Sequence, residues 1–491
     1  MDTSILVKKY FEEKKFVESS IRSFNNFIEV GLKDVVEENK EAEPNIIPHN
    51  IESFKIRFGK ITVGKPQIIE ADGSKRPIFP AEARLRKISY SAPIFLEISS
   101  YINDVQRENF KAEIGKLPIM LRSKYCNLHG LNREELIKKG EDPTDPGGYF
   151  IINGTERVLV TIEDLAENNF LVEKGPKDNM VGRIFSTQGS YKIPHQLEIN
   201  KEGIFTVSFT RMKEVPIIVV LKAIGMLKDE DIMKAISSEK MYDEVLLNLF
   251  EFAEIKDQEE AVDFLARKSG FTQAKEIRVE RARDMLDKFL LPHLGRDKNS
   301  RKAKAQNLCK MLKKIVRVQR KVLPTDDKDH YMNKRLRLSG NLLTDLFQVN
   351  FKLLVNDILY NFQRIIKRGK LPSIKVIIRE KLLTSRIYSA MATGEWVGGR
   401  QGVSQRIDRV NFLAMVSHLQ KVNSPLSSSQ ENFEARALHC THIGRLCPIE
   451  TPEGTNIGLR KNLAMLCSIS QNIDEQKLLE KIEELGVKAI Q

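Results

Sequence analysis

The sequence has few cysteines and no long hydrophobic run, and these absences exclude several classes of protein. Its 491 residues contain an odd, scattered set of five cysteines without a C-x-x-C pair, which argues against a disulfide framework or zinc knuckle and predicts reduced thiols. No apolar stretch reaches the length of a membrane span, and the first residues carry no secretion signal. We therefore expect a cytoplasmic protein that is independent of membranes. The cysteines are Cys126, Cys309, Cys440, Cys447 and Cys467.

The composition is that of a globular, basic protein. Hydrophobic residues make up 41% of the chain and charged residues 30%, and a chain of this length predicts about three domains. The net charge of +13 favours a polyanionic partner such as nucleic acid, through phosphate neutralisation and counterion release. Acidic protein partners would account for the same total, so charge alone does not name the partner.

Local patterns predict a multidomain α+β fold with mixed sheets and packed helices. Residues 1–45 have helical apolar spacing, whereas short β-branched runs separated by Gly and Pro begin at Ile51. Strand character continues through 83–90 and 93–98, and another strand is expected to enter a tight turn at Asn153-Gly154. Residues 341–370 predict an amphipathic helix, after which loops should dominate. No fixed-period repeat is present.

Between residues 171 and 325 the sequence pattern changes to a mixture of strands and helices, which suggests a separate domain. We expect a strand at 205–209 and helices at 242–253 and 260–268. The last helix of this stretch has an apolar seam, so its many cations form either a solvated face or a face turned to phosphates. Those cations are Arg296, Lys298, Arg301, Lys302, Lys304, Lys310, Lys313, Lys314, Arg317, Arg320 and Lys321.

Residues 439–459 form the densest cluster of functional groups, with two imidazoles, a guanidinium, carboxylates, prolines and glycines. Such a composition is typical of a preorganised polar loop, in which Arg445 would pair with Glu450 or Glu453. A metal site built from His439, His442 and the nearby Cys440 and Cys447 is the competing interpretation. Its spacing matches no closed zinc pattern.

Residues 398–411 form a glycine- and arginine-rich run. Glycines let backbone amides approach phosphates, and the polar side chains are of the kind that contact phosphate oxygens. A mobile surface loop is the alternative, and the run contains neither the Walker-A nor the G-x-G-x-x-G signature. The candidate binding residues are Arg400, Gln401, Ser404, Gln405, Arg406 and Arg409.

A third segment, residues 326–347, begins with three carboxylates and a histidine. Asp326, Asp327, Asp329 and His330 suggest a magnesium site, but neighbouring lysines and arginines would neutralise much of that charge. We favour a charged turn that leads into an amphipathic helix. No Ser/His/Asp set has a recognisable local signature.

Together these motifs resemble the second-largest subunit of multisubunit RNA polymerases, called β in bacteria and B in archaea. Residues 439–454 are similar to the family's H-x-T-H-x-G-x-x-C-P-x-E-T-P-E-G, and residues 148–158 to its G-x-F-I-I-N-G-x-E-[RK]-V. Segments 84–90, 118–126 and 327–347 are also similar, so the resemblance covers residues 20–470. The length and the apolar helix expected near residues 478–491 resemble the amino-terminal half made by archaea with a split gene, B″.

The resemblance implies a domain order. It predicts a protrusion at 1–170 that returns at 326–385, a lobe at 171–325, a fork at 386–470 and the start of an external region at 471–491. The fork would contact DNA and the RNA–DNA hybrid through the 398–411 run and through His418 and Lys421 in residues 417–425, where this chain has Gln420 and bacterial relatives have more arginine. His439, His442, Arg445, Glu450 and Glu453 would form a structural loop near the active centre.

The resemblance also implies partners and an activity. The chain would be part of DNA-directed RNA polymerase, a nucleotidyltransferase, and would be inactive alone. It would hold no cofactor, because the largest subunit binds most of the catalytic Mg²⁺. Its partners would be the carboxy-terminal half B′, the largest and other subunits, initiation factors and nucleic acid. Two alternatives are an autonomous nucleic-acid-binding protein and a metal-dependent phosphoryl-transfer enzyme built on Asp326, Asp327, Asp329 and His330.

Overall fold

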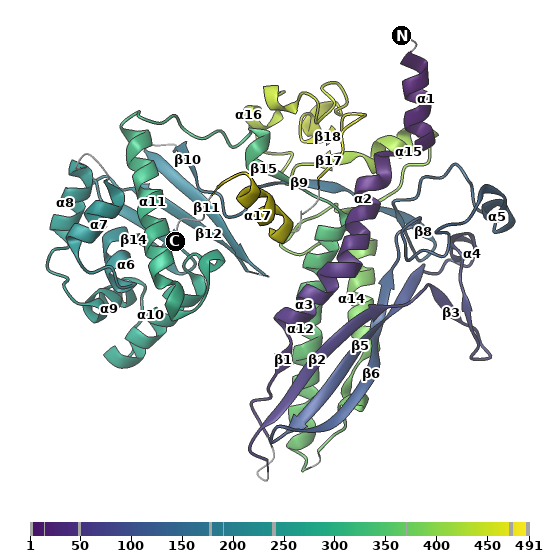
Figure 1. Cartoon of the computed structure of the whole chain (residues 1–491), viewed down its shortest axis with the longest axis horizontal. Coiled ribbons are helices and arrows are strands. Elements are labelled where there is room, and N and C mark those ends of the chain that lie inside the picture. The colour runs from purple at the N-terminus through teal and green to yellow at the C-terminus, as the bar shows by residue number, and fades with distance from the viewer. Residues whose placement is uncertain are drawn as a thin grey trace. The chain divides into compact units, whose positions relative to one another are not determined.

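The computed structural model describes residues 3–13, 15–47, 51–175, 179–189, 191–237, 242–369, 371–470 and 475–487. These residues form two compact units (Figure 1). Unit 1 contains residues 1–164 and 336–491, and unit 2 contains residues 165–335. Unit 2 is therefore an insertion in the sequence of unit 1, with limits several residues outside the predicted 171–325.

Unit 1 begins with helices, as the sequence predicts. These are α1 (Thr3–Glu13), α2 (Lys15–Asn26), a π-helical turn (Phe27–Gly31) and α3 (Leu32–Glu38). Their apolar side chains pack on the long helix α12 (Ser339–Ile366), where the rings of Phe27 and Phe347 meet edge to face at 6.4 Å. The predicted helix at 341–370 is thus confirmed.

An antiparallel sheet lies beside these helices (Figure 1). Its order is β1-β2-β5-β6, and Phe54 of β2 stacks on Phe362 of α12 with ring centres 4.3 Å apart. Alternate residues of β2 and β5 are buried, which is the pattern of a sheet with one covered face. The strands are β1 (Glu41–Ala42), β2 (Phe54–Val63), β5 (Ser91–Ile102) and β6 (Val105–Pro118), and a separate hairpin is formed by β3 (Gln67–Ile69) and β4 (Lys75–Pro77).

Two predictions for unit 1 are wrong. Residues 83–85, expected in a strand, lie in helix α4 (Pro80–Leu85), because Pro80 at the first helical position favours a helix start over an extended chain. The segment after Lys370 contains α14 (Glu380–Thr393), a helix of 14 residues, where loops were expected. Gly394, in the left-handed conformation, ends that helix. The shorter helices are α5 (Arg133–Lys138), α13 (Ile374–Ile377), α15 (Phe412–Leu419), α16 (Phe433–Arg436) and α17 (Glu475–Glu484).

Unit 2 combines an antiparallel sheet with a group of helices. The strands follow one another in the order β10-β11-β12-β13-β14, and the helices come after them in the chain. The predicted strand at 205–209 and the helices near 242–253 and 260–268 are confirmed. The strands are β10 (Leu171–Lys174), β11 (Met180–Gln188), β12 (Tyr191–Ile199), β13 (Phe205–Phe209) and β14 (Met212–Pro216). The helices are α6 (Ile217–Ala223), α7 (Asp229–Ile236), α8 (Asp243–Glu251), α9 (Gln258–Lys268), α10 (Lys275–Phe289) and α11 (Arg301–Gln319).

The chain returns to unit 1 through β15 (Lys334–Arg337). Each unit has its own hydrophobic core. Within the described ranges, no helix is both long and apolar enough to cross a lipid bilayer.

Candidate nucleic-acid interface

Two small sheets of unit 1 bring together motifs that lie far apart in the sequence. In the first sheet, β7 (Phe150–Ile152) and β8 (Thr155–Leu159) come from the 148–158 motif, and β16 (Ser404–Arg406) comes from the 398–411 run. In the second, β9 (Thr161–Leu165) pairs in parallel with β17 (Lys421–Asn423), which pairs with β18 (Arg460–Asn462) just after the 439–459 loop. The fold therefore brings together four segments of the chain: the 148–158 motif, the 398–411 run, residues 417–425 and the strand that directly follows the 439–459 loop.

The turn between β7 and β8 is built as the sequence predicts. Asn153 and Gly154 both have positive φ, at 50° and 76°, which is the backbone of a type I′ hairpin turn. A Cβ at Gly154 would lie 2.7 Å from Cα of Lys87, so the turn also needs the missing side chain. This turn fixes the register of β8, against which β16 pairs.

Arg400 is held in an ion pair inside unit 1. Its guanidinium lies 2.5 Å from the Asp164 carboxylate, which also lies 3.4 Å from Arg337. The Arg400 backbone pairs with Trp396, whose indole N–H donates to the Leu342 carbonyl oxygen at 2.8 Å. Arg400 therefore fixes one end of the 398–411 run, and its charge is neutralised by protein rather than directed to a phosphate.

Arg409 has a similar structural task at the other end of the run. Its guanidinium donates to Glu156 at 2.8 Å, to Asp145 at 3.0 Å and to the Tyr149 hydroxyl at 2.9 Å. Arg84 approaches the same carboxylate of Glu156 from the opposite side, at 2.7 Å. Arg409 was expected to contact phosphates, but most of its donors are engaged in this internal network.

The electrostatics of the network keep its carboxylate ionised. Burial alone would raise the pKa of Glu156, but hydrogen bonds and charge from Arg409 and Arg84 outweigh it and lower that pKa. The pKa of the Tyr149 hydroxyl is raised well above its usual value by burial and by the Asp145 charge. The network thus holds two arginines between carboxylates and a neutral phenol.

His418, Gln405 and Ser404 also have internal partners. The Asp408 N–H donates to Nδ1 of His418 at 3.1 Å, so Nε2 carries the proton that faces Oε1 of Gln405 at 3.1 Å. Burial, with Lys421 nearby, lowers the pKa of His418 to about 4, and the imidazole is neutral at pH 7. The Ser404 hydroxyl donates to the Met391 carbonyl oxygen at 2.6 Å. Gln420 is buried as well, and its amide donates to the Tyr10 hydroxyl at 2.8 Å.

Three of the predicted binding residues have side chains that make no hydrogen bond or ion pair within the described part of the structure. Gln401 and Arg406 are exposed, and Lys421 is half-buried. Arg406 lies directly opposite Arg157 on the neighbouring strand, a like-charge arrangement that destabilises a sheet unless an anion compensates for it. Burial and the nearby Arg460 lower the pKa of Lys421, so an anion would strengthen its charged form.

The 439–459 loop is irregular, with two 3-10 turns at Cys440–His442 and Gly454–Asn456. The ring nitrogen of His439 accepts from the Thr441 N–H at 3.2 Å, and that of His442 accepts from the His439 N–H at 3.4 Å. These nitrogens cap the turn, and the Cys440 thiol lies 3.9 Å from Nδ1 of His439. Among the described residues no group of three or more His, Cys, Asp or Glu side chains could hold a metal ion.

The predicted ion pair of Arg445 is wrong. Its guanidinium donates to the Thr441 carbonyl oxygen at 3.0 Å, and Glu450 accepts from the Ser417 hydroxyl at 2.5 Å. Glu453 is exposed at the start of the second 3-10 turn. A single-turn backbone contact satisfies Arg445 at lower entropic cost than a pair spanning the loop. Both carboxylates therefore remain at the surface.

Arg436 was not among the predicted site residues, yet its hydrogen bonds hold this loop to the segment before α16. Its two terminal nitrogens donate to the carbonyl oxygens of four residues. Two of these precede α16, one lies in the second 3-10 turn and one directly follows that turn, so one guanidinium joins both stretches. Gly458 makes the approach possible, because a Cβ there would lie 2.2 Å from the Arg436 carbonyl oxygen. No local pattern marks this arginine. The carbonyl acceptors are those of Ser428, Gln430, Thr455 and Ile457.

A buried ion pair joins the second small sheet. Nζ of Lys461 lies 3.0 Å from the Glu163 carboxylate, and their side chains are only 8% and 4% exposed. In the sequence, each residue looks like a polar residue at the end of a strand. Only the folded structure shows that the two side chains are in contact.

The three aspartates at the start of the 326–347 segment lie in unit 2, and they too have hydrogen-bond or ion-pair partners within the protein. Asp326 accepts from the Val172 N–H at 2.7 Å and from Lys314 at 2.6 Å, and Asp329 pairs with Lys334 at 3.1 Å. Asp327 accepts from the Asp329 N–H, and His330 Nδ1 accepts from the Met332 N–H. The favoured interpretation, a charged turn, agrees with this geometry, and a convergent metal site does not.

Helix α11 of unit 2 exposes only part of its charge. Arg301 pairs with Asp287 at 2.6 Å and Arg320 with Glu244 at 2.6 Å. Lys304 is fully buried, and its ammonium donates to the carbonyl oxygens of Leu286 and Asp287. Lys302 and Lys310 are exposed.

The family models and known proteins that match this chain describe RNA polymerase subunits. The family model "RNA polymerase beta subunit" matches residues 15–385, and the model "RNA polymerase Rpb2, domain 3" matches residues 405–469. DNA-directed RNA polymerase subunit Rpo2N of Methanocaldococcus jannaschii is 43% identical, over 98% of this chain and 98% of the relative. The chain belongs to the RNA polymerase beta subunit family.

Other members of this family show which part the chain represents. Rpo2N of Halobacterium salinarum is 40% identical over 100% of this chain and 96% of its own length. The subunit Rpo2 of Saccharolobus solfataricus is 41% identical over 99% of this chain, but the match covers only 43% of that longer protein. The chain corresponds to the N-terminal half of the archaeal second-largest subunit, as its motifs indicated.

Proposed function

We propose that this chain forms a non-catalytic wall of the DNA cleft in an archaeal RNA polymerase, holding DNA and the RNA–DNA hybrid beside an active centre built by other chains. The observation that carries the proposal is that strands from the 148–158 motif, the 398–411 run and residues 417–425, with the strand directly after the 439–459 loop, meet in the two small sheets of unit 1. Two motif arginines, Arg400 and Arg409, brace the 398–411 run from within. The run is thereby preorganised, which lowers the entropic cost of binding.

Phosphate contact falls, in this proposal, to the side chains that the internal network leaves unpaired. Arg406 is the main cation, with Arg157 opposite it, and Lys421 and Gln401 add charge and hydrogen bonds. Arg400, Ser404, Gln405, Arg409 and His418 position the run instead of touching nucleic acid. Electrostatic positioning of this kind is sequence-independent, as a general polymerase requires.

Catalytic Mg²⁺ would be held mainly by the largest subunit, outside this chain. The side chains that could have formed an internal site do not fit a divalent ion, because Asp326 and Asp329 each face a lysine within 3.1 Å. Oxygen ligands must converge on such an ion. We therefore assign no step of RNA synthesis to these carboxylates.

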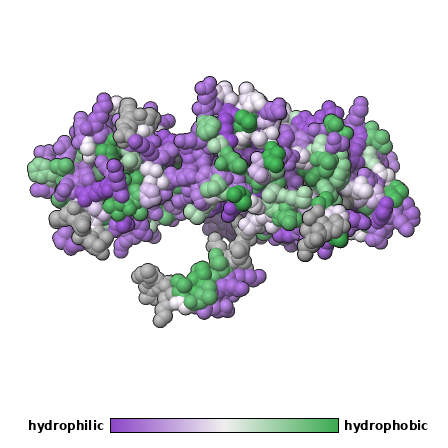
Figure 2. Space-filling model, turned by 90° about the horizontal axis from the view of Figure 1, so that it is seen from above, coloured by the Kyte–Doolittle hydropathy of each residue, from purple (hydrophilic) through white to green (hydrophobic). Residues whose placement is uncertain are grey.

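The carboxy-terminal half of the subunit would cover an apolar surface of unit 1. Large apolar side chains stand exposed around the fork motifs, at Phe433, Leu438, Ile443, Ile449 and Leu466. Helix α17 adds leucines that appear as a green group in the lower part of Figure 2. Monomeric proteins seldom expose so many, and a relative that continues through both halves as one chain indicates the partner. The complex would act in the cytoplasm with the other subunits and initiation factors.

Reconstitution from separately purified subunits tests the proposal. The chain alone, with Mg²⁺, a DNA template and ribonucleotides, should make no RNA, and the full set of archaeal subunits should make RNA only when the chain is present. A Leu438→Asp, Ile443→Asp variant should fail to retain the carboxy-terminal half in gel filtration. Ile277→Asp, an exposed isoleucine of unit 2, is the matched control and should assemble normally. RNA synthesis by the chain alone would refute the proposal.

A further inference from the structure

A pocket of about 710 Å³ in unit 1 is used by none of the contacts described above. It opens between α1, α5, the 142–145 loop and the first residue of α15. Its lining residues are Lys8, Phe11, Glu12, Arg122, Arg133, Leu136, Pro143, Thr144 and Phe412. The volume lies in the range of small-ligand sites and accommodates one nucleotide.

Two aromatic rings form the apolar part of the pocket. Phe11 and Phe412 lie with ring centres 5.8 Å apart and planes at 59°, and Leu136 and Pro143 extend the surface. Phe412 is 43% exposed although it begins a helix whose inner residues, Met415 and Val416, are buried. An exposed ring in a concave site offers a stacking surface.

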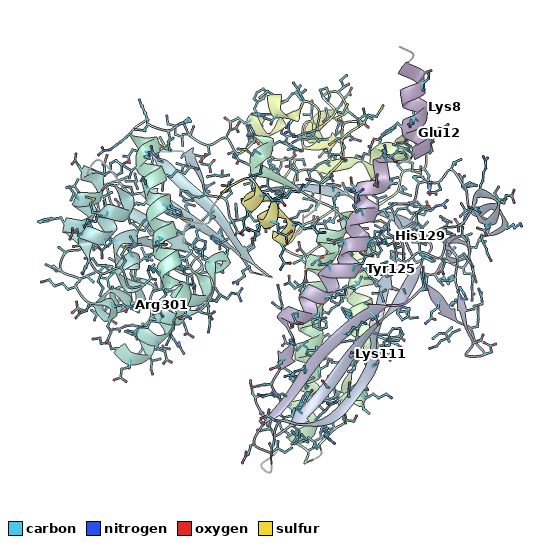
Figure 3. All side chains as sticks on the ribbon, in the orientation of Figure 1. Lys8, Glu12, Lys111, Tyr125, His129 and Arg301 are labelled. Atoms are coloured by element: carbon cyan, nitrogen blue, oxygen red, sulfur yellow. The ribbon has the colours of Figure 1, made fainter. Side chains whose placement is uncertain are left out.

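Cations lie around these rings. Lys8 and Arg133 are exposed, and neither has an ion-pair partner among the residues that the structure describes. Arg122 donates one N–H to the Asp142 carbonyl oxygen at 3.1 Å and has further donors. Glu12, one turn after Lys8 on α1 (Figure 3), and the Thr144 hydroxyl are the other polar groups of the lining. Three cations against one carboxylate make the pocket attractive to an anion.

We propose that this pocket binds one unpaired nucleotide of single-stranded nucleic acid, with its base stacked on Phe412 and its phosphates held by Lys8 and Arg133. The Glu12 carboxylate can accept a hydrogen bond from an amino group of the base, and the Thr144 hydroxyl, which donates its proton to the Asp142 carboxylate at 2.7 Å, can accept another. A stacking ring beside unpaired cations is the combination that sequence-independent single-strand binding uses.

The position of Phe412 in the chain favours nucleic acid over an acidic peptide. Phe412 directly follows the 398–411 run, and Arg406 lies six positions before it, close enough for a strand of a few nucleotides to join the two. The inference goes beyond the proposed function, which needs no such pocket. An acidic, apolar peptide remains the competing occupant, and the experiment separates the two.

Tryptophan fluorescence tests the stacking directly. Trp396 is the only tryptophan of the chain and is 5% exposed, so it contributes a steady background that a ligand does not quench. In the full chain, Phe412→Trp should gain emission that single-stranded hexauridylate quenches in a saturable way, because a stacked base contacts the indole. Tyr360→Trp, at an aromatic position 64% exposed on α12 of unit 1, is the matched control and should show no saturable quenching.

Salt dependence and an affinity loss supply independent readouts in the otherwise unchanged sequence. Lys8→Gln and Arg133→Gln should each lower the slope of log affinity against log salt for fluorescein-labelled hexauridylate by about 0.7. Phe412→Ala should weaken binding roughly 5- to 100-fold with the slope unchanged. Lys138→Gln, at a lysine outside the pocket on the same helix as Arg133, should change neither.

Two results would overturn the inference. One is quenching of Phe412→Trp by a Glu- and Leu-containing peptide but not by hexauridylate. The other is an unchanged salt slope in both charge variants. Either result leaves the proposed function intact if the reconstituted polymerase still depends on the chain, so the two proposals fail separately.

Discussion

The 398–411 run of unit 1 and helix α11 of unit 2 are two basic segments that were candidates for phosphate contact, and they neutralise their charge in different ways. Helix α11 takes partners from the same unit: Arg301 meets Asp287, Lys314 meets Asp326 and Lys304 is capped by carbonyl oxygens. In the run, Arg409 meets Glu156 across 253 positions, and the two ends are tied down while Arg406 stays exposed. The comparison teaches that the number of cations in a segment does not measure its affinity for phosphate.

The largest effect should come from the buried pair of unit 1. Replacing Lys461 by alanine removes the ammonium that lies 3.0 Å from the buried Glu163 carboxylate, which should cost about 3–5 kcal/mol of unfolding free energy. Urea unfolding followed by Trp396 fluorescence measures it, because that residue also lies in unit 1. A Glu163→Gln, Lys461→Met double variant should regain more than half of the loss. A loss below about 1 kcal/mol in the single variant would show that water reaches the pair.

A smaller loss is expected from the half-buried pair of unit 2. Asp287→Ala should destabilise the chain by about 2 kcal/mol, because the Arg301 guanidinium loses two hydrogen bonds in a largely buried place. Glu244→Ala, which frees Arg320 at a more exposed position, is the matched control and should cost under about 1 kcal/mol. Far-ultraviolet circular dichroism during urea unfolding gives both values. Equal losses would contradict the view that burial sets the strength of these pairs.

Because of Lys304, the unfolding free energy of unit 2 should vary with pH in the alkaline range. Burial lowers the pKa of its ammonium to about 8, against about 10.4 for an exposed lysine in the unfolded chain. Between these values the unfolded state binds more protons, so unfolding free energy should rise with pH from about 8 to 10. Lys304→Met should flatten that rise, as hydrogen exchange or urea unfolding at several pH values would show. Lys302→Met, on the exposed face, should leave it unchanged; a flat wild-type profile would contradict the burial of the charge.

The smallest stability effect, and the most direct test of the comparison, concerns Arg406. Arg406→Gln should change unfolding free energy by less than about 0.5 kcal/mol, yet lower the salt slope of nucleic-acid binding by the assembled polymerase by about one. Arg409→Gln should do the opposite, lowering stability because Glu156 and Tyr149 lose donors, with little change in slope. Filter binding at several salt concentrations decides between them. A slope change from Arg409 alone would reverse the assignment of roles.

Much of the fold could be predicted from the sequence where the determining interactions are local. The helix α12, the helix α9 and the Asn153-Gly154 turn follow from apolar spacing and turn chemistry within a few residues. The strand expected at 83–90 failed because Pro80, just outside the segment, starts a helix. Helix α14 was missed, although Gly394 at its end is a recognisable stop signal.

The sequence could predict which segments form the site, but not which residue in each segment faces outward and which one is bonded internally. Composition and motif resemblance selected the 398–411 and 439–459 segments, and both lie in unit 1. Which arginine faces outward depends on strand register and on partners such as Glu156 and Asp164, which lie hundreds of positions away. Arg445 failed to pair as expected because a carbonyl oxygen one turn away satisfies it. Arg436 carried no signal, since its acceptors are all backbone.

The insertion of unit 2 has a consequence for how the protein is made. Glu163 and Lys461 are 298 positions apart, so at 5–20 residues per second the ribosome delivers the lysine roughly 15–60 s after the glutamate. Until β15 and β17 have been made, β9 lacks both of its neighbours in the sheet, and the nascent chain displays an unpaired strand with a buried-type carboxylate. Chaperones that shield newly synthesised polypeptides therefore have most to protect at β9, well before any other polymerase component arrives.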